Sequence, residues 1–346
     1  MSKENEGRTE ISEIGEFGLI NRISEKFKNS NESTILGIGD DAAVIDKNSD
    51  IFHLLSTDML IEGVHFDLTY MPLQHLGYKA VAVNVSDIAA MNGMPNQITV
   101  NLALSNRFSV EAVDMLYSGI KHACEDYGID LVGGDTTASN SGLMISISVL
   151  GTVKKDKITY RKNAEVNDII CITGDLGGAL MGLQVLEREK EVFKTNPDMQ
   201  PELDKYEYLV GRQLKPRARM DVIHELDEIG IVPTSMIDIS DGLASELFHI
   251  AKNSGVGISI YEDKLPIDQT TYDAAVEFKF DPTTCALNGG EDYELLFTIG
   301  QDEFEKIKNH PDISTVGYID KPDSGLKMVT KGGNTVPIQA QGWKHF

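Results

Sequence analysis

Six times along this chain, a mostly apolar run leads into small residues that are followed by an acid. The six segments are Gly39-Asp40-Asp41, Ser56-Thr57-Asp58, Val85-Ser86-Asp87, Gly133-Gly134-Asp135, Asp238-Ile239-Ser240-Asp241 and Gly289-Gly290-Glu291-Asp292. Most of the preceding runs look like strands, and an acid at the mouth of a buried strand is costly unless a cation meets it. Few lysines or arginines lie beside these acids in the sequence. The pattern therefore predicts a site for hard divalent cations, Mg2+ above all, holding phosphates.

The charge of the chain limits its partners. Its 31 basic and 54 acidic residues give a net charge of −23. Nucleic acids and anionic membranes need a basic face, so neither is an expected partner, whereas a polyanionic substrate could bind through metal ions. The polar N-terminus has no signal-peptide core, no run of about 18 apolar residues occurs, and the three cysteines form no CxxC pair. We expect a soluble, cytoplasmic protein without a disulfide framework or a zinc site.

The length of 346 residues predicts two domains. We expect disorder over 1–13, an N-terminal α+β half over 14–153 with a mixed or antiparallel sheet, and a C-terminal α+β half over 154–346. In the first half, helices are expected over 14–27, 73–91 and 110–127, and strands near 35–38, 42–45, 52–56, 98–104, 129–132 and 143–153. In the second half, strands are expected over 168–173, 236–239, 257–260, 295–299 and 314–319, and helices over 179–188, 218–229 and 243–253. Residues 189–206 resemble an exposed insertion, to which we assign no role.

Two common nucleotide-binding motifs are absent. The segment Gly37-Ile38-Gly39-Asp40-Asp41-Ala42 superficially matches the dinucleotide fingerprint, but that fingerprint needs a following helix, and the strand-like Ala43-Val44-Ile45 follows here. Two aspartates would also face the pyrophosphate. No GxxxxGK[ST] occurs, so any nucleotide triphosphate would be bound without a P-loop lysine.

Asp87 is the strongest single candidate for a metal ligand. It lies inside the helix expected over 73–91, among apolar neighbours such as Val85 and Ile88. A carboxylate there needs a partner, and the adjacent Asn84 and Ser86 are neutral, so a metal is favoured. The oxygens of Ser56-Thr57-Asp58 also suit Mg2+, although these residue types equally cap helices, and alone the segment favours a cap.

Two further segments and one arginine suit phosphate. The glycines of Gly133-Gly134-Asp135 permit close approach of the backbone to a phosphate, although an ordinary turn is the alternative. Asp238-Ile239-Ser240-Asp241 stands at a strand-to-helix junction, where an N-cap and phosphate binding can coexist. Arg161 could reach a phosphate oxygen or be an ordinary surface arginine.

Two ring-bearing residues are weaker candidates. His65, which follows the Asp58 segment, is more often a structural residue in such a setting. Trp343 is the one tryptophan of the chain, and it either anchors the C-terminal tail or forms a stacking surface for a ring.

These motifs, in this order, resemble the thiamine-monophosphate kinase family of the aminoimidazole-ribonucleotide-synthetase-like superfamily. The resemblance runs from Gly15-Glu16-Phe17 to the C-terminus. It rests on the six acidic segments, on Gly63-Val64-His65-Phe66, on the run from Lys79 to Met91, and on Gly289-Gly290-Glu291-Asp292-Tyr293-Glu294-Leu295. It implies two α+β halves and a homodimer in which the N-terminal sheets form a barrel, with the active site in the cleft between the halves and near the partner subunit.

The resemblance also implies the roles of individual residues. The implied metal ligands are Asp41, Ser56, Thr57, Asp58, Asp87, Asp135, Asp238 and Asp241. The implied ATP contacts are Gly134, Asp135, Arg161, Ser240 and, by a looser match, Tyr117. The implied substrate contacts are His65, Glu291 and Trp343, a position where the family often has tyrosine.

The implied reaction transfers a phosphoryl group from ATP to thiamine monophosphate, with several Mg2+ ions stabilising charge. No residue is expected to act as a general base, because the attacking phosphate oxygen is already anionic. Asp58, Asp87 and Asp135 are expected to hold ions on the ATP phosphates, and Asp41, Asp87 and Asp238 ions on the acceptor phosphate. The alternatives are another ATP-using synthetase of the superfamily, or a non-catalytic acidic metal-binding module. A selenophosphate synthetase is disfavoured because the first cysteine is Cys124.

Overall fold

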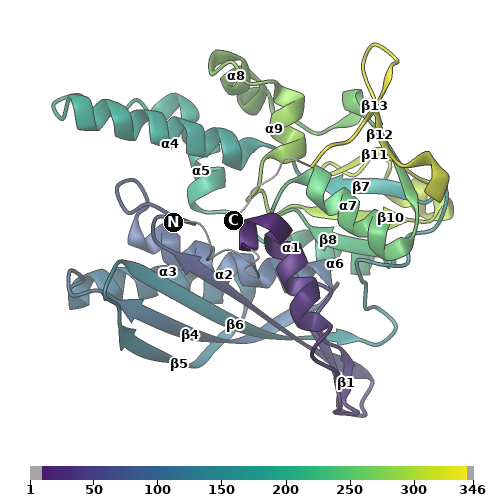
Figure 1. Cartoon of the computed structure of the whole chain (residues 1–346), viewed down its shortest axis with the longest axis horizontal. Coiled ribbons are helices and arrows are strands. Elements are labelled where there is room, and N and C mark those ends of the chain that lie inside the picture. Colours follow the sequence, from purple (N-terminus) through teal and green to yellow (C-terminus); the bar gives the residue numbers. More distant parts are fainter. Residues whose placement is uncertain (1–9, 341–346) are drawn as a thin grey trace, which may run out of the picture.

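The structure, a computed structural model, describes residues 10–340 and consists of two packed α+β units (Figure 1). The expected α+β class is confirmed. Trp343 and residues 1–9 lie outside the described residues. Helix α1 (Ile11–Ser24) begins inside the stretch expected to be disordered and three residues before the predicted helix, and Gly15 interrupts it with φ 65° and ψ −178°. No helix within 10–340 is long and apolar enough to cross a membrane.

The N-terminal unit is a six-stranded sheet covered on one face by two helices (Figure 1). The strand order is β1-β2-β3-β6-β4-β5, and only β4 and β5 pair in parallel, so the sheet is mixed as predicted. The strands are β1 (Thr34–Leu36), β2 (Ala43–Asp46), β3 (Ile51–Ile61), β4 (Met94–Leu104), β5 (Asp130–Ala138) and β6 (Leu143–Lys154). The helices are α2 (Leu73–Ala90) and α3 (Val110–Tyr127), and α3 has the predicted limits.

Two strands are longer than their sequences suggest. β3 pairs with β6 along its whole length, from Ile51 opposite Lys154 to Ile61 opposite Met144, and β5 pairs with β4 as far as Ala138. Asp58 and Asp135 therefore lie inside strands. The expected strand ends at 56 and 132 are wrong, and the ordinary turn considered as an alternative at 133–135 is part of β5 instead. Ladder hydrogen bonds from a neighbouring strand keep polar residues extended, an effect that local propensity does not report.

The alternation of side chains divides these residues between the two faces of the sheet. Along β3, Leu54 and Leu60 are buried on the helix-covered face, which Ser56 and Asp58 share. Met59 belongs to the other face. Met59 pairs with Ser146 of β6, Ser146 pairs with Asn101 of β4, and Asn101 pairs with Asp135 of β5, so these residues form one row across that face of the sheet. Asp135 consequently lies on the face that α2 and α3 leave uncovered.

The C-terminal unit is a seven-stranded sheet in the order β13-β12-β9-β11-β7-β10-β8. Its strands are β7 (Ile169–Thr173), β8 (Ser235–Asp238), β9 (Gly257–Tyr261), β10 (Leu295–Ile299), β11 (Ile313–Asp320), β12 (Leu326–Val329) and β13 (Thr335–Pro337). Its helices are α4 (Gly178–Thr195), α5 (Glu207–Leu214), α6 (Met220–Glu228), α7 (Leu243–Ser254), α8 (Gln269–Glu277), α9 (Pro282–Asn288) and α10 (Phe304–Ile307). Short 3-10 turns occur at Asp204–Tyr206, Glu262–Lys264, Gln301–Glu303 and Pro322–Ser324. The expected insertion at 189–206 begins as the last two turns of α4.

Helix α2 joins the two units. Nearly all of its residues are buried, because it packs on its own sheet, on α3 and on strands of the other unit; the main hydrophobic cluster extends from Val85 to Met236 and Phe297. Its approach to α3 requires glycine, since a Cβ on Gly77 would lie 2.1 Å from the carbonyl oxygen of Leu116.

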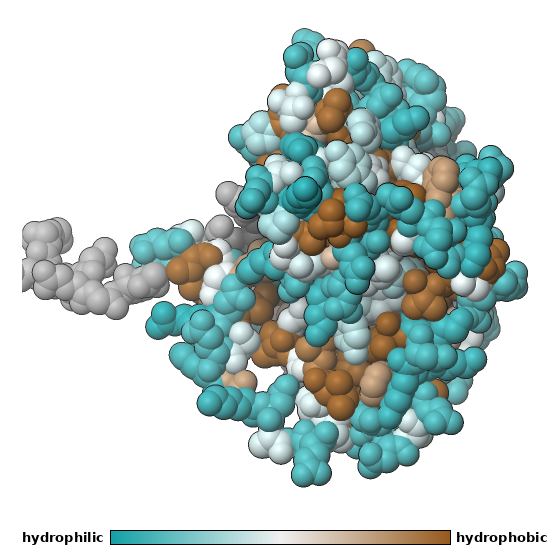
Figure 2. All heavy atoms as spheres, turned by 90° about the vertical axis from the view of Figure 1, so that its right-hand side faces the viewer, coloured by the Kyte–Doolittle hydropathy of each residue, from teal (hydrophilic) through white to brown (hydrophobic). Residues whose placement is uncertain are grey.

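On the side displayed in Figure 2, hydrophobic residues gather towards the lower half of a mostly hydrophilic surface.

A buried ion network fixes the segment that precedes β10. Arg212 donates to Glu294 at 2.7 Å, and Arg219 donates to the other oxygen of Glu294, also at 2.7 Å. The carboxylate of Asp292 accepts the backbone N–H groups of Gly177 and Ala179 at the start of α4. Both carboxylates are nearly inaccessible to solvent, so this network holds the 289–294 segment against α4 and α5.

Replacing Arg212 by methionine is expected to lower the free energy of unfolding by about 3–5 kcal/mol, because the buried Asp292 loses its cation and the buried Glu294 keeps only Arg219. Urea titration followed by circular dichroism measures the change. Arg188→Met is the matched control: Arg188 pairs with Glu189 and Glu277 nearer the surface, where an ion pair contributes about 1 kcal/mol or less. Equal losses in the two variants would contradict the structural role of the network.

Candidate metal and phosphate site

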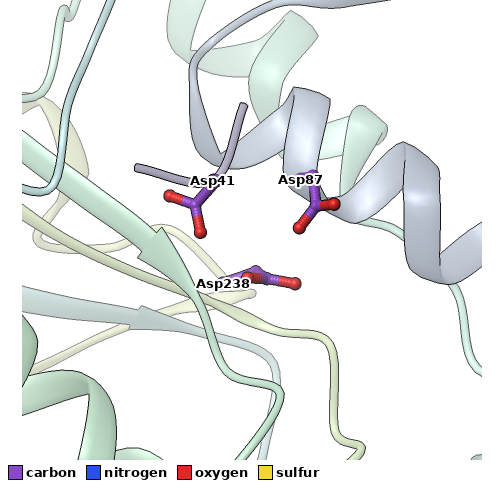
Figure 3. Close-up of side chains that lie close together, drawn as sticks. All are labelled: Asp41, Asp87 and Asp238. Carbon is purple, nitrogen blue, oxygen red and sulfur yellow. The ribbon is translucent and has the colours of Figure 1, made fainter. Parts of the chain in front are cut away.

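Three aspartates from distant parts of the chain converge where the two units meet (Figure 3). Asp41 stands in the turn between β1 and β2, Asp87 in the last turns of α2, and Asp238 at the end of β8. One carboxylate oxygen of each lies within 4.8 Å of the others. The structure thus brings together three of the predicted metal ligands, including the mid-helix aspartate.

Two serine hydroxyls orient the triad. Ser86 donates to Oδ2 of Asp238 at 2.6 Å, and Ser56 donates to Oδ2 of Asp87. Asp58, on the same face of β3 as Ser56, is anchored through its backbone N–H, which donates to the amide oxygen of Asn84 at 3.1 Å. Each hydroxyl fixes one oxygen of its aspartate and leaves the other oxygen available to a ligand.

Crowding of buried carboxylates raises their affinity for protons. Burial, followed by the negative charge of Asp41, raises the pKa of Asp238 to about 7. Burial alone raises the pKa of Asp58 to about 6, and burial with the charges of Asp58, Asp238 and Asp41 raises the pKa of Asp87 well above its usual value. Such a cluster ionises fully only when a cation offsets the repulsion.

Arg161 supplies part of that positive charge. Its guanidinium forms an ion pair with Oδ1 of Asp41, and its backbone N–H donates to Asp40 at 3.2 Å. Oδ2 of Asp41 is buried and has no hydrogen-bond partner. An orphaned carboxylate oxygen within an all-oxygen cluster is the donor set that Mg2+ takes, so these residues fit the predicted metal.

The triad opens into a cleft of about 1180 Å³ between the units. The predicted residues that line it are Asp41, Ser56, Thr57, Asp58, His65, Asp87, Arg161, Asp238, Ser240, Asp241 and Glu291. The hydroxyl of Thr57, however, donates to the carbonyl oxygen of Ile147 and accepts from Ser148. It is therefore occupied by β6 rather than directed at the triad.

Three predicted residues do not line this cleft: Tyr117, Gly134 and Asp135. Tyr117 of α3 is half-buried against the main hydrophobic cluster. Gly134 lies close to β4, where a Cβ would stand 1.8 Å from the carbonyl oxygen of Val100, and Asp135 lies on the uncovered face of the sheet. One chain alone does not bring them to the triad.

Glu291 also lines the cleft and is held by two neighbours. Its Oε1 lies 2.9 Å from Nζ of Lys79, and its Oε2 accepts from the amide of Gln213 at 2.7 Å. Glu291 and Tyr293 both have positive φ, 66° and 52°, which turns them into the cleft while Asp292 faces the buried network. Glu291 therefore faces the cleft, whereas the adjacent Asp292 belongs to the buried ion network.

His65 lines the same cleft in a defined tautomer. Its Nδ1 accepts the backbone N–H of Ile61 at 3.0 Å, so the proton of the neutral ring resides on Nε2. His65 therefore lines the cleft, its contact with a substrate stays a prediction, and the structural alternative is partly right because the ring closes the turn after β3.

Sequence reasoning missed three residues of this cleft region. Lys79 is fully buried in α2, Glu246 is buried in α7 where it accepts the backbone N–H of Asp241 at 3.1 Å, and Tyr70 lines the cleft. The argument that singled out Asp87 applies equally to Lys79, a charged residue within an apolar helical run. No local signal marks Glu246 or Tyr70.

Comparison with known proteins defines the class and then the family. Residues 39–153 match the family described as AIR synthase related protein, N-terminal domain. The chain is 34% identical to the thiamine-monophosphate kinase of Bacillus subtilis over 96% of its own length and 100% of the relative's. It is 35% identical to that of Aquifex aeolicus, over 97% and 99%. A solved structure of AaThiL complexed with AMPPCP and TMP superposes with a TM-score of 0.83 at 32% identity, covering 98% of this chain and 100% of that one.

The match over residues 39–153 relates the N-terminal unit to the AIR-synthase-related proteins. Within that class, full-length identity at this level shows that the chain belongs to the thiamine-monophosphate kinase family.

Proposed function

We propose that this chain is the enzyme that phosphorylates thiamine monophosphate with ATP, yielding thiamine diphosphate and ADP in the cytoplasm. The observation that carries the proposal is the triad of Asp41, Asp87 and Asp238 in the lining of a large cleft, in a chain related over its full length to kinases of this name. The full-length relationship does not favour a synthetase of the superfamily. A carboxylate cluster that serine hydroxyls orient beside a large cleft does not favour a non-catalytic metal-binding module.

The chemistry needs positioning more than proton transfer. An oxygen of the acceptor phosphate attacks the γ-phosphorus of ATP, the bond from that phosphorus to the β,γ-bridging oxygen breaks, and ADP leaves with that electron pair. The acceptor oxygen is already anionic at neutral pH, so no side chain has to remove a proton. The barrier lies in bringing two polyanions together inside an acidic cleft.

Asp41, Asp87 and Asp238 would hold Mg2+, with Asp58 and Asp241 as further ligands. When bound, the metal neutralises the phosphate charges and the developing charge on the bridging oxygen. Ser56 and Ser86 keep two of the triad carboxylates in place through the hydrogen bonds described above. Arg161 and Ser240, which line the cleft, would contact ATP, and His65, Glu291 and Trp343 would contact the organic part of the substrate.

The roles assigned to Gly134, Asp135 and Tyr117 require a second copy of the chain, because these residues do not line the cleft of their own chain. Thr57 and Asp135 both belong to the uncovered face of the N-terminal sheet, which also exposes Leu55, Met59 and Leu150. A homodimer that pairs these faces would bury the apolar residues and bring Asp135 of one subunit towards the cleft of the other. We therefore include a homodimer in the proposal.

An ADP-release assay tests the proposal directly. The purified protein with ATP and Mg2+ is expected to form ADP and thiamine diphosphate in equal amounts when thiamine monophosphate is supplied, and neither product when thiamine replaces it. Omission of Mg2+ is expected to stop both. ADP formation that ignores thiamine monophosphate would contradict the function.

A further inference from the structure

Lys79 is a buried cation that the chemistry above leaves without a role. Its side chain is inaccessible to solvent, although it stands in the middle of an apolar helix. Its Nζ lies 2.9 Å from Oε1 of Glu291 and 3.4 Å from the carbonyl oxygen of Gln213. A lysine is kept in such surroundings only if its charge is paired, and the pair here crosses from the N-terminal to the C-terminal unit.

The same face of α2 holds the C-terminal unit at a second point. Ser86 follows Lys79 by seven residues, which is close to two helical turns, so the two side chains lie nearly in line. Ser86 donates a hydrogen bond to Asp238 of the triad, whereas Lys79 forms an ion pair with Glu291, which also lines the cleft. The two attachments are therefore about 10 Å apart along one rigid helix.

Within the C-terminal unit, backbone hydrogen bonds join the segment that contains Glu291 to the segment that follows Asp238. The N–H of Glu291 donates to the carbonyl oxygen of Ser240 at 2.7 Å, and that of Tyr293 donates to the carbonyl oxygen of Ile239 at 2.9 Å. Glu291 also adopts a left-handed conformation, with φ 66°, which a glutamate rarely takes unless its surroundings hold it there. Its carboxylate thus stands at a set distance from the triad.

We propose that Lys79 is a positioning residue that fixes Glu291 as the acceptor for an uncharged N–H donor of the substrate. Each oxygen of Glu291 has one partner, Lys79 or Gln213, and each retains a lone pair on a side chain that stays partly open to the cleft. Because Lys79 offsets the charge of Glu291, the pair favours a neutral amine over a cation. An exocyclic amine on an aromatic ring, at the end of the substrate remote from its phosphate, matches this chemistry. The inference rests on the proposed function and deepens it.

The test compares thiamine monophosphate with an analogue in which a ring carbonyl replaces the exocyclic amine. Wild-type enzyme is expected to prefer the amine in kcat/KM, because the carbonyl would meet the lone pairs of Glu291. In Lys79→Met, the KM for thiamine monophosphate is expected to rise about 10- to 100-fold, as for the loss of one charge-assisted hydrogen bond. The kcat and the KM for ATP are expected to stay within about threefold, since Lys79 does not touch the triad. The preference for the amine is expected to disappear.

Lys79→Gln is a second variant, neutral but polar, for which the same loss of preference is expected if the methionine variant does not fold. Val81→Ala, a buried change in the same helix that touches neither the cleft nor Glu291, is the matched control and is expected to keep the preference. An unchanged preference in a folded Lys79 variant, or the same kinetic pattern in Val81→Ala, would overturn the inference. A wild-type protein that does not phosphorylate thiamine monophosphate would instead overturn the proposed function.

Discussion

Asp87→Asn is expected to lower kcat by about 10²–10³-fold or more while making the metal-free protein more stable. The kinetic loss follows because Asp87 is one of the three carboxylates of the triad, and the amide that replaces it is neutral and keeps a single oxygen ligand. The gain in stability follows because Asp87 lies between Asp58, Asp238 and Asp41, whose charges disfavour its ionised form. Steady-state kinetics and thermal unfolding with and without Mg2+ measure both effects.

The pH dependence of that stabilisation has a definite sign. Burial and like charge raise the pKa of Asp238 to about 7, and that of Asp87 also rises well above its unfolded value near 3.8. Between these pKa values the folded wild type binds protons that the unfolded chain releases, so wild type loses stability as the pH rises towards 7, whereas the amide of Asp87→Asn does not titrate. The difference in Tm between Asp87→Asn and wild type is therefore expected to be larger at pH 8 than at pH 5.

Asp114→Asn, in an exposed position on α3, is a matched control that is expected to change neither kcat nor the effect of Mg2+ on Tm. Added Mg2+ is expected to raise the Tm of wild type at pH 8 and to have little effect on Asp87→Asn. Full activity of Asp87→Asn with unchanged dependence on Mg2+ would refute the metal site.

Asp87 could be identified from the sequence because its helix is defined locally. The apolar run over 73–91 and the stop at Asn92-Gly93 predict a helix, and an aspartate inside it needs a partner wherever the helix is placed. The limits of α3 and β10 were predictable for the same reason: strong local patterns bounded by residues that break them.

Asp135 and Thr57 could not be placed in the same way. Their position depends on which strands pair and in what register, and a shift of one residue would move each to the opposite face of the sheet. Lys79 and Glu291 illustrate the same limit for a contact between a helix and a distant segment of the chain. Their ion pair joins two units far apart in the sequence, and neither residue alone indicates the other. Local pattern thus predicted the kinds of residue in the site, whereas pairing and packing decide which of them meet.

Mixed dimers that carry Asp87→Asn in one subunit and Asp135→Asn in the other are expected to recover about half of the wild-type activity. Asp135 lies on the face of the sheet opposite to Asp58 and does not line the cleft of its own chain. If it serves catalysis, it serves the cleft of the partner. Each variant dimer alone then has two defective sites, whereas the mixed dimer has one site with both substitutions and one with neither. Two affinity tags on co-expressed subunits allow the mixed dimers to be purified and assayed for ADP release.

The matched control combines Asp87→Asn with Asp41→Asn. Asp41 and Asp87 meet within one chain, with oxygens inside 4.8 Å of each other, so every site of that mixed dimer contains one defect and no activity should return. Recovery in the control would mean that the triad itself forms between subunits. An inactive Asp135→Asn protein that regains nothing with Asp87→Asn would show that Asp135 acts within its own chain, which the register of the sheet opposes. Recovery confined to the Asp135 pair would establish both the homodimer and the contribution of each subunit to the other's site.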